Sequence, residues 1–249
     1  MKSRSFLLSV VLVVLLLSAL GIQGIRAQEP PPREETGPKQ PLAGAAVSPA
    51  GIQTADLTGD LIPEDLVYSL TCGEMTVSNV TFTGAEVAAG VFQGGNGIIG
   101  FDKGIILSTG DIANVVGPNT SNGIGVVNGT AADADLTALS GFPTHDAAVL
   151  EFDFVAQTTE IQFRYVFASD EYNEFVGSDF NDVFAFYVNG QNCATIAGDA
   201  ISINTVNGTQ NSGFYINNDI PSGAALNTEM DGLTTVLTCV APVNANQAN

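Results

Sequence analysis

The sequence predicts an all-β domain of the β-sandwich or jelly-roll type. Short alternating or continuous apolar runs are separated by clusters of Gly and Asn, at roughly ten-residue intervals. No stretch after the first 27 residues keeps the 3.6-residue period of a long helix. We therefore expect one β domain at residues 52–249, after a signal peptide at 1–27 and a Pro-rich linker at 28–51.

The N-terminus has the composition of a signal peptide. Lys2 and Arg4 form a basic start, residues 6–20 are apolar, and Ala27 is a suitable residue before a cleavage site. An uncleaved anchor is the weaker alternative, because the apolar run is shorter than the roughly 20 residues of a membrane span. The six prolines of residues 28–51 predict an extended spacer. We expect a secreted or cell-surface protein with no membrane span in the mature chain.

The chain is strongly acidic, with 26 Asp and Glu against 7 Lys and Arg and a net charge of −19. Removal of the signal peptide would make it more acidic, because Lys2, Arg4 and Arg26 lie there. Such a surface repels nucleic acid and anionic membranes, so neither is an expected partner. It suits divalent cations, or solubility alone.

The strands follow from local patterns. Residues 161–168 alternate, with Phe163, Tyr165 and Phe167 on one face. Residues 183–188 are apolar throughout, which predicts a strand covered on both faces, and Asn189-Gly190 predicts a tight hairpin turn after it. A proline at position 63 followed by two acids could open one short helix. The remaining predicted strands are residues 77–82, 104–108, 147–154, 200–206 and 233–239, and residues 114–135 are a long polar loop.

An acidic loop joins the strands at 161–168 and 183–188. Its carboxylates repel one another unless solvent, amides or a cation offsets the charge. Ca²⁺ takes six to eight oxygen ligands, including amide oxygens, so the loop predicts a calcium site, although its spacing is not that of an EF-hand. The predicted ligands are Asp170, Glu171, Asn173, Glu174, Asp179, Asn181 and Asp182. A solvated loop whose Asp and Asn residues cap turns is the alternative, and Asp133 with Asp135 is a weaker second candidate.

Three cysteines in an exported chain allow one disulfide. Cys193 follows the predicted hairpin turn and Cys239 closes a predicted strand, so we favour that pair and leave Cys72 unpaired. The other two pairings remain open. A Cα separation within about 7 Å is needed for any of them.

Enzyme motifs are weak. Gly95 to Gly100 matches G-x-G-x-x-G, but no helix can follow it, so these are turn glycines. His145 is the only histidine and has no nucleophile motif beside it. The enzymatic alternative is a carbohydrate-active hydrolase that uses two carboxylates of the 170–182 loop as acid and base. The absence of Trp for sugar stacking counts against it.

Several long motifs resemble one family. FASDEYNEFVGSDFNDVFAF, DLTALSGFPTHDAAVLEFDF, MDGLTTVLTC, SINTVN and the segment from VSNVTF to VVGPN are similar to the choice-of-anchor L domain of bacterial exported proteins. The similarity runs from about Ala55 to Val240. It implies a surface module and supplies no biochemical activity. Members of that family continue with further β segments and an anchor, so we expect this domain to be C-terminally incomplete.

The sequence therefore predicts a secreted or cell-surface, non-enzymatic binding or structural module, stabilised by calcium and suited to adhesion. The expected partners are extracellular polysaccharide, matrix or another surface protein.

Overall fold

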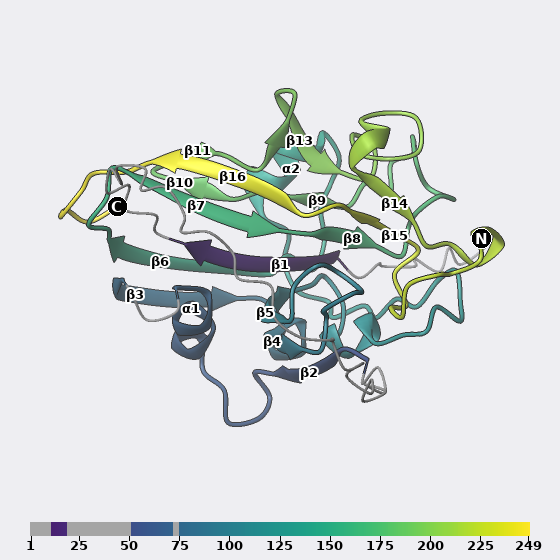
Figure 1. Cartoon of the computed structure of the whole chain (residues 1–249), viewed down its shortest axis with the longest axis horizontal. Coiled ribbons are helices and arrows are strands. Elements are labelled where there is room, and N and C mark those ends of the chain that lie inside the picture. Colours follow the sequence, from purple (N-terminus) through teal and green to yellow (C-terminus); the bar gives the residue numbers. More distant parts are fainter. Residues whose placement is uncertain (1–10, 19–50, 72–74) are drawn as a thin grey trace, which may run out of the picture.

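The computed structural model describes residues 11–18, 51–71 and 75–249, and these form a predominantly β structure (Figure 1). One nine-stranded sheet is accompanied by small sheets of two, three and two strands. The α-helices of the described residues, α1 (Pro63–Thr71) and α2 (Ala134–Ser140), are short. The all-β prediction is confirmed, and the finer choice of sandwich or jelly roll stays a prediction.

The main sheet runs in the order β14-β15-β8-β1-β5-β4-β2, with β7 beside β1 and β16 beside β7. All these neighbours are antiparallel. The strands are β1 (Val11–Ser18), β2 (Gln53–Asp56), β4 (Ala89–Gln93), β5 (Lys103–Leu107), β7 (Glu160–Tyr165), β8 (Phe167–Ser169), β14 (Tyr215–Asn217), β15 (Gly232–Thr234) and β16 (Leu237–Pro242).

The central strand comes from the N-terminus. β1 pairs with β5 along one edge and with β7 and β8 along the other, and Figure 1 shows it as the purple strand in the middle of the sheet. These residues belong to the apolar run of the predicted signal peptide. The rest of residues 1–50 lies outside the described residues, so the signal peptide and the linker stay predictions.

Both faces of the main sheet are covered by apolar side chains. Successive side chains of a strand point to opposite faces, and the buried residues divide accordingly between two hydrophobic clusters. Ile105 of β5 and Phe167 of β8 belong to one cluster, whereas Ile106 and Ala168 belong to the other. The predicted aromatic face of residues 161–168 is confirmed, because Phe163, Tyr165 and Phe167 are buried in the first cluster.

The smaller sheets lie beside this main sheet. β3 pairs with β6, β9 and β12 flank β13, and β10 pairs with β11. Their bounds are β3 (Thr76–Thr83), β6 (Val149–Val155), β9 (Val183–Phe184), β10 (Tyr187–Val188), β11 (Gln191–Asn192), β12 (Thr195–Ile196) and β13 (Asp199–Ser202). Four 3₁₀ turns complete the described elements: η1 (Glu86–Ala88), η2 (Ile112–Val115), η3 (Ser212–Phe214) and η4 (Ile220–Ser222).

The prediction of one buried strand over residues 183–188 is wrong. β9 ends at Phe184, β10 begins at Tyr187, and 42% of the Tyr187 surface is exposed. The Phe186 amide donates to the side-chain Oδ1 of Asn192 (3.1 Å) rather than to a strand backbone, which interrupts the ladder. The predicted turn is confirmed, because Asn189 and Gly190 have φ of 49° and 76° and connect β10 to β11.

Two other local predictions can be placed. α1 begins at Pro63 with Glu64 and Asp65 in its first turn, so the short helix is confirmed. The structure also contains the disulfide between Cys193 and Cys239, with a Cα separation of 5.3 Å. It links the β10–β11 hairpin to β16. Cys72 lies outside the described residues.

Candidate metal centre

Two buried carboxylates meet at one end of the main sheet. Ser169 of β8 lies opposite Gly232 of β15 in the antiparallel register. One residue further along each strand, Asp170 therefore faces Asp231, and only 4% and 0% of their surfaces are exposed. Like charges directly opposite each other destabilise a strand pair, so this position needs protons or a cation.

The loop after Pro118 covers these carboxylates. Asn119 donates from Nδ2 to Asp231 Oδ1 (2.6 Å) and to the Asn218 carbonyl (3.0 Å). The Ile124 amide donates to Asp170 Oδ2. Three buried oxygens around this point accept no hydrogen bond from the described residues: Asp170 Oδ1, Asp231 Oδ2 and Asn119 Oδ1.

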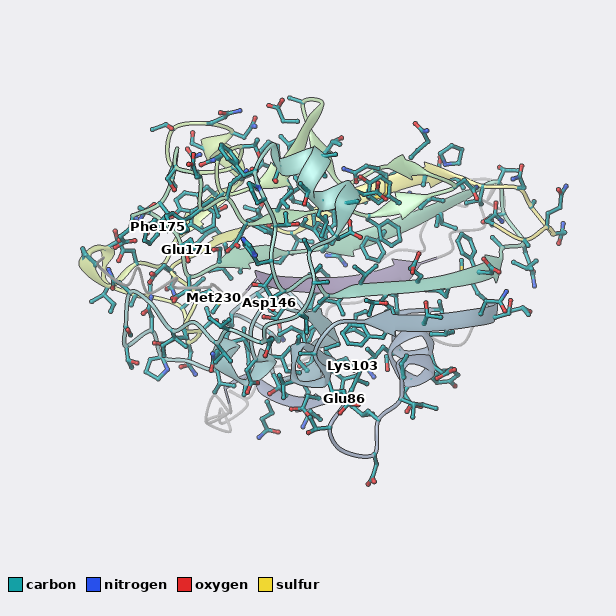
Figure 2. The ribbon with its side chains drawn as sticks, turned by 180° about the vertical axis from the view of Figure 1, so that it is seen from behind. Glu86, Lys103, Asp146, Glu171, Phe175 and Met230 are labelled. Carbon is teal, nitrogen blue, oxygen red and sulfur yellow. A yellow bond between two sulfur atoms is a disulfide. The ribbon has the colours of Figure 1, made fainter. Side chains whose placement is uncertain are left out.

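Further carboxylates surround this pair. Glu229 accepts from the Thr120 amide through both oxygens (3.0 Å each). Asn122 donates from Nδ2 to Glu174 (2.7 Å) and to Asp219 (3.3 Å). We call Asp170, Glu174, Asp219, Glu229 and Asp231 the acidic cluster. Figure 2 labels Met230, which lies between Glu229 and Asp231 of the acidic cluster in the sequence, and Glu171 at the same end of the molecule.

A second pair of carboxylates lies on the other side of β8. The Ser169 hydroxyl donates to Asp182 Oδ2 (2.6 Å) and accepts from the Glu171 amide (3.0 Å). Both acids line a cavity of about 1080 Å³, whose walls also include β6 and residues 183–187. Glu171 is buried, and its Oε2 has no hydrogen-bond partner among the described residues.

Burial and mutual repulsion raise the pKa of these acids. Burial, and then the charge of Asp231, raise the pKa of Asp170 to about 7. Burial is also the main reason why the pKa of Asp231 rises to about 7, although a hydrogen bond from Asn119 opposes the shift. Burial, and then Asp182, raise the pKa of Glu171 to about 8. The pKa of Asp182 rises to about 6 through burial, opposed by the Ser169 hydroxyl.

Basic side chains do not explain how these charges are tolerated. Lys103 and Arg164 are the Lys and Arg residues of the described ranges. The Arg164 guanidinium lies over the ring of Phe101, 5.1 Å from its centre. Every charge that shifts the pKa of Asp170 belongs to another carboxylate.

Comparison with known proteins decides the family. The sequence pattern of the choice-of-anchor L domain matches residues 53–249. The chain belongs to the choice-of-anchor L domain family. This membership indicates a surface-associated, non-enzymatic module of a cell-surface or exported protein. No curated protein matches the chain, and no solved structure does.

Two features of the described residues bear on the membrane and metal predictions for this choice-of-anchor L domain. Across residues 11–18, 51–71 and 75–249, no helix is long and apolar enough to cross a membrane. In the same ranges, no three His, Cys, Asp or Glu side chains are grouped so that they could hold a metal ion by themselves. A metal site here would need amide or carbonyl oxygens as well.

The seven predicted ligands of this choice-of-anchor L domain do not gather around one point. Asp170 and Glu174 belong to the acidic cluster, and Asn173 touches its edge by donating to Asp219 (3.2 Å). Glu171 and Asp182 form the separate pair on the cavity side, and Asp179 lines the cavity with them. Asn181 accepts from the Asn204 amide (3.2 Å) and donates to Ser140 (3.5 Å).

The weaker candidate has a structural role. Asp133 is the N-cap of α2, where Oδ1 accepts from the amides of Asp135 and Leu136 at 2.9 Å each. An N-cap carboxylate satisfies otherwise unpaired helix donors, so this residue is accounted for without a metal.

Sequence reasoning missed Asn119, Asp219, Glu229 and Asp231 of the choice-of-anchor L domain. Two of them carried a readable signal. Asn119 ends the motif VVGPN, and Asp231 lies in MDGLTTVLTC, two residues before the predicted strand at 233–239. A polar residue within a family motif and at a strand end is a candidate for binding, because strand ends bring distant loops together.

Proposed function

We propose that this choice-of-anchor L domain is an exported or surface-displayed, non-enzymatic binding module that calcium stabilises at the acidic cluster. It would engage extracellular polysaccharide, matrix or another surface protein. The observation that carries the proposal is the buried pair Asp170 and Asp231, which face each other and each keep one oxygen without a hydrogen-bond partner.

The chemistry of the available donors favours Ca²⁺. The unpaired atoms are two carboxylate oxygens and the amide oxygen of Asn119, all hard ligands. Calcium accepts such mixed sets of six to eight oxygens and tolerates irregular geometry, whereas Mg²⁺ demands a nearly ideal octahedron. A site built from two carboxylates, an amide and backbone carbonyls is also compatible with the lack of a three-acid group among the described residues.

A cation at this point would fix the surface next to it. It would connect the ends of β8 and β15 to the loop that contains Asn119. β14 is an edge strand of the main sheet; its Ile216 is 36% exposed, and Phe214, the last residue of η3 directly before it, is 43% exposed. An edge strand with exposed apolar side chains is a common docking surface for a partner. Calcium would thus hold the binding surface in one arrangement.

Calcium dependence of thermal stability tests the proposal. Binding to the folded state alone adds about 2.7 kcal/mol at a hundredfold excess over Kd. We expect calcium to raise the melting temperature and a chelator to reverse the rise. Asp170→Asn should abolish the response, whereas Asp60→Asn, in an exposed turn, should keep it. Equal melting temperatures in calcium and chelator would contradict the calcium proposal.

The cavity supports a second candidate function, carbohydrate hydrolysis. Glu171 and Asp182 both line it, and their pKa values of about 8 and 6 could suit an acid and a base. However, glycoside hydrolysis needs two carboxylates on opposite sides of the scissile bond. The contacts of Ser169 hold only one of the two, because its hydroxyl donates to the Asp182 carboxylate but accepts from the backbone amide of Glu171. Polysaccharide turnover that Glu171→Gln abolishes would favour this candidate.

A further inference from the structure

β1 is the only connection between two halves of the main sheet, as far as the described strands show. On one side lie β5, β4 and β2, and on the other β7 with β16 and β8 with β15 and β14. No described ladder joins β5 directly to β7 or β8. Figure 1 shows β1 between these two halves. Without β1, the sheet would be open in its middle.

The space that β1 fills has defined walls, and we call it the strand slot. Toward β5, the register pairs Val13 with Leu107 and Leu15 with Ile105. Toward the other wall, residues 11–13 pair with β8 and residues 16–18 with β7, so each of the eight residues of β1 pairs with at least one wall. The strand slot therefore accepts an extended segment of this length, antiparallel to both walls.

The walls also specify the chemistry of the occupant. Ile105 and Ile106 of β5, and Phe167 and Ala168 of β8, are fully buried and belong to the clusters on both faces of the sheet. A strand between them must be apolar on both faces, because each face is covered. The requirement for apolar side chains on both faces is weaker toward the β7 end of the strand slot, because Arg164 of β7 is exposed. The sequence VLVVLLLS of β1 meets this requirement.

Signal-peptide cleavage would empty the strand slot. The predicted cut after Ala27 removes all of β1. Two facing strand edges would then keep unpaired amides and carbonyls inside the protein, which is costly. The two edges cannot simply pair in their present positions, because a strand occupies about 4.8 Å of the sheet.

We propose that the strand slot is a binding site for an eight-residue apolar segment of another polypeptide, added as a central β-strand between β5 and β7–β8. Val11–Ser18 fills it in the unprocessed chain, and a segment of the same chemistry replaces it once residues 1–27 are removed. The affinity comes from backbone pairing on both edges, and the selectivity from the requirement for apolar side chains on both faces.

The basic residues of the chain allow a direct test on the full protein. Arg4 and Arg26 flank β1, and Arg33 and Lys39 follow in the predicted linker. Trypsin treatment of the folded, unprocessed and oxidised chain should cleave the backbone between β1 and the rest of the domain, and so yield the peptide 5–26 and residues 40–249. We expect both to elute together in gel filtration, with slow amide exchange retained at Ile105.

A matched pair of variants distinguishes binding by strand pairing from non-specific hydrophobic association. Val13→Pro removes a backbone donor from the residue of β1 that pairs with both β5 and β8, whereas Val13→Leu keeps the donor and an apolar side chain. The Leu variant should retain the peptide after trypsin treatment, and the Pro variant should lose it. Equal retention of the peptide by both variants would show that the segment does not bind as a strand.

Removal of the peptide completes the test. When denaturant strips peptide 5–26 from the trypsin-treated protein, refolded residues 40–249 should exchange the Ile105 amide at least roughly tenfold faster. Added peptide 5–26 should restore the protection. If the stripped domain keeps the same melting temperature and the same protection without any peptide, its two walls close by themselves and the proposal is overturned.

Discussion

Replacing one member of the opposed carboxylate pair should have opposite effects with and without calcium. Asp231→Asn keeps the shape of the side chain, and its amide oxygen can still accept from Asn119 Nδ2, which now donates to Asp231 Oδ1 at 2.6 Å. The substitution removes the charge opposite Asp170. At pH 8 without calcium the variant should therefore be more stable than the unmodified protein.

The magnitude follows from the pKa of Asp170. Its rise from 3.8 to about 7 is about three units, and each unit is worth about 1.4 kcal/mol. Burial is the larger cause and Asp231 the next, so we assign about 1 to 2 kcal/mol to the charge of Asp231. For a domain of this size, 1 kcal/mol shifts the melting temperature by about 2 to 4 °C. Asp231→Asn should thus raise it by about 2 to 8 °C.

Calcium should reverse the order. The unmodified protein should gain about 5 to 11 °C at a hundredfold excess of calcium over Kd, and Asp231→Asn should gain almost nothing. Differential scanning fluorimetry at pH 8, with calcium and with chelator, measures all four states, and Asp60→Asn serves as a surface control. If Asp231→Asn melts lower than the unmodified protein without calcium and still responds to calcium, the repulsion argument is wrong.

Three further predictions rest on separate features. Without calcium the melting temperature should fall from pH 5 to pH 8. The pKa values of Asp170 and Asp231 are raised to about 7 in the folded protein, so the stability that their protonation supplies is complete below about pH 4 and lost as the pH rises past 7. A rise of the melting temperature over this range, measured by calorimetry, would refute the prediction. Replacing Cys193 and Cys239 together with Ala opens a loop of sequence separation 46 and should cost about 4 kcal/mol in urea unfolding, so an unchanged midpoint would count against the disulfide as a stabiliser. Gly232→Ala should destabilise by about 1 to 3 kcal/mol, because a Cβ there would lie 2.4 Å from the Tyr172 ring; a variant with unchanged stability would show that the ring can move freely.

Local sequence pattern was sufficient to predict elements whose conformation depends on a single segment of the chain. The aromatic face at 161–168, the helix at Pro63 and the Asn189-Gly190 turn are all present. The prediction of one strand over residues 183–188 is wrong because the side chain of Asn192, in the second strand of the hairpin, accepts the Phe186 amide that a continuous strand would use. An apolar run does not reveal which partner its backbone will find.

The acidic loop shows which part of the candidate site could not be predicted from the sequence. Asp170 was predicted, but its counterpart Asp231 is distant in sequence and reaches it through the β8–β15 register. The sequence placed the loop's carboxylates in one group, whereas the Ser169 hydroxyl binds Asp182 on the other side of β8 and divides them. Strand alternation explains the division, because neighbouring residues at a strand end point to opposite faces.

β8 connects the two proposed sites. Ser169 pairs with Val11 in the strand slot and with Gly232 of β15, and Asp170 of the acidic cluster is the next residue. An occupant of the strand slot fixes the end of β8, and so fixes the carboxylate that calcium needs. Binding at the two sites should therefore be coupled, and thermodynamic linkage requires the coupling to be reciprocal.

Titration of the peptide-stripped domain measures this coupling. Calcium should tighten the binding of peptide 5–26, and bound peptide should tighten calcium by the same factor, about 5- to 150-fold for typical couplings. Asp170→Asn should remove the calcium effect on peptide affinity while the peptide still binds. Equal peptide affinity with calcium and with chelator would show that the end of β8 is rigid without its neighbours, and that the two sites act independently.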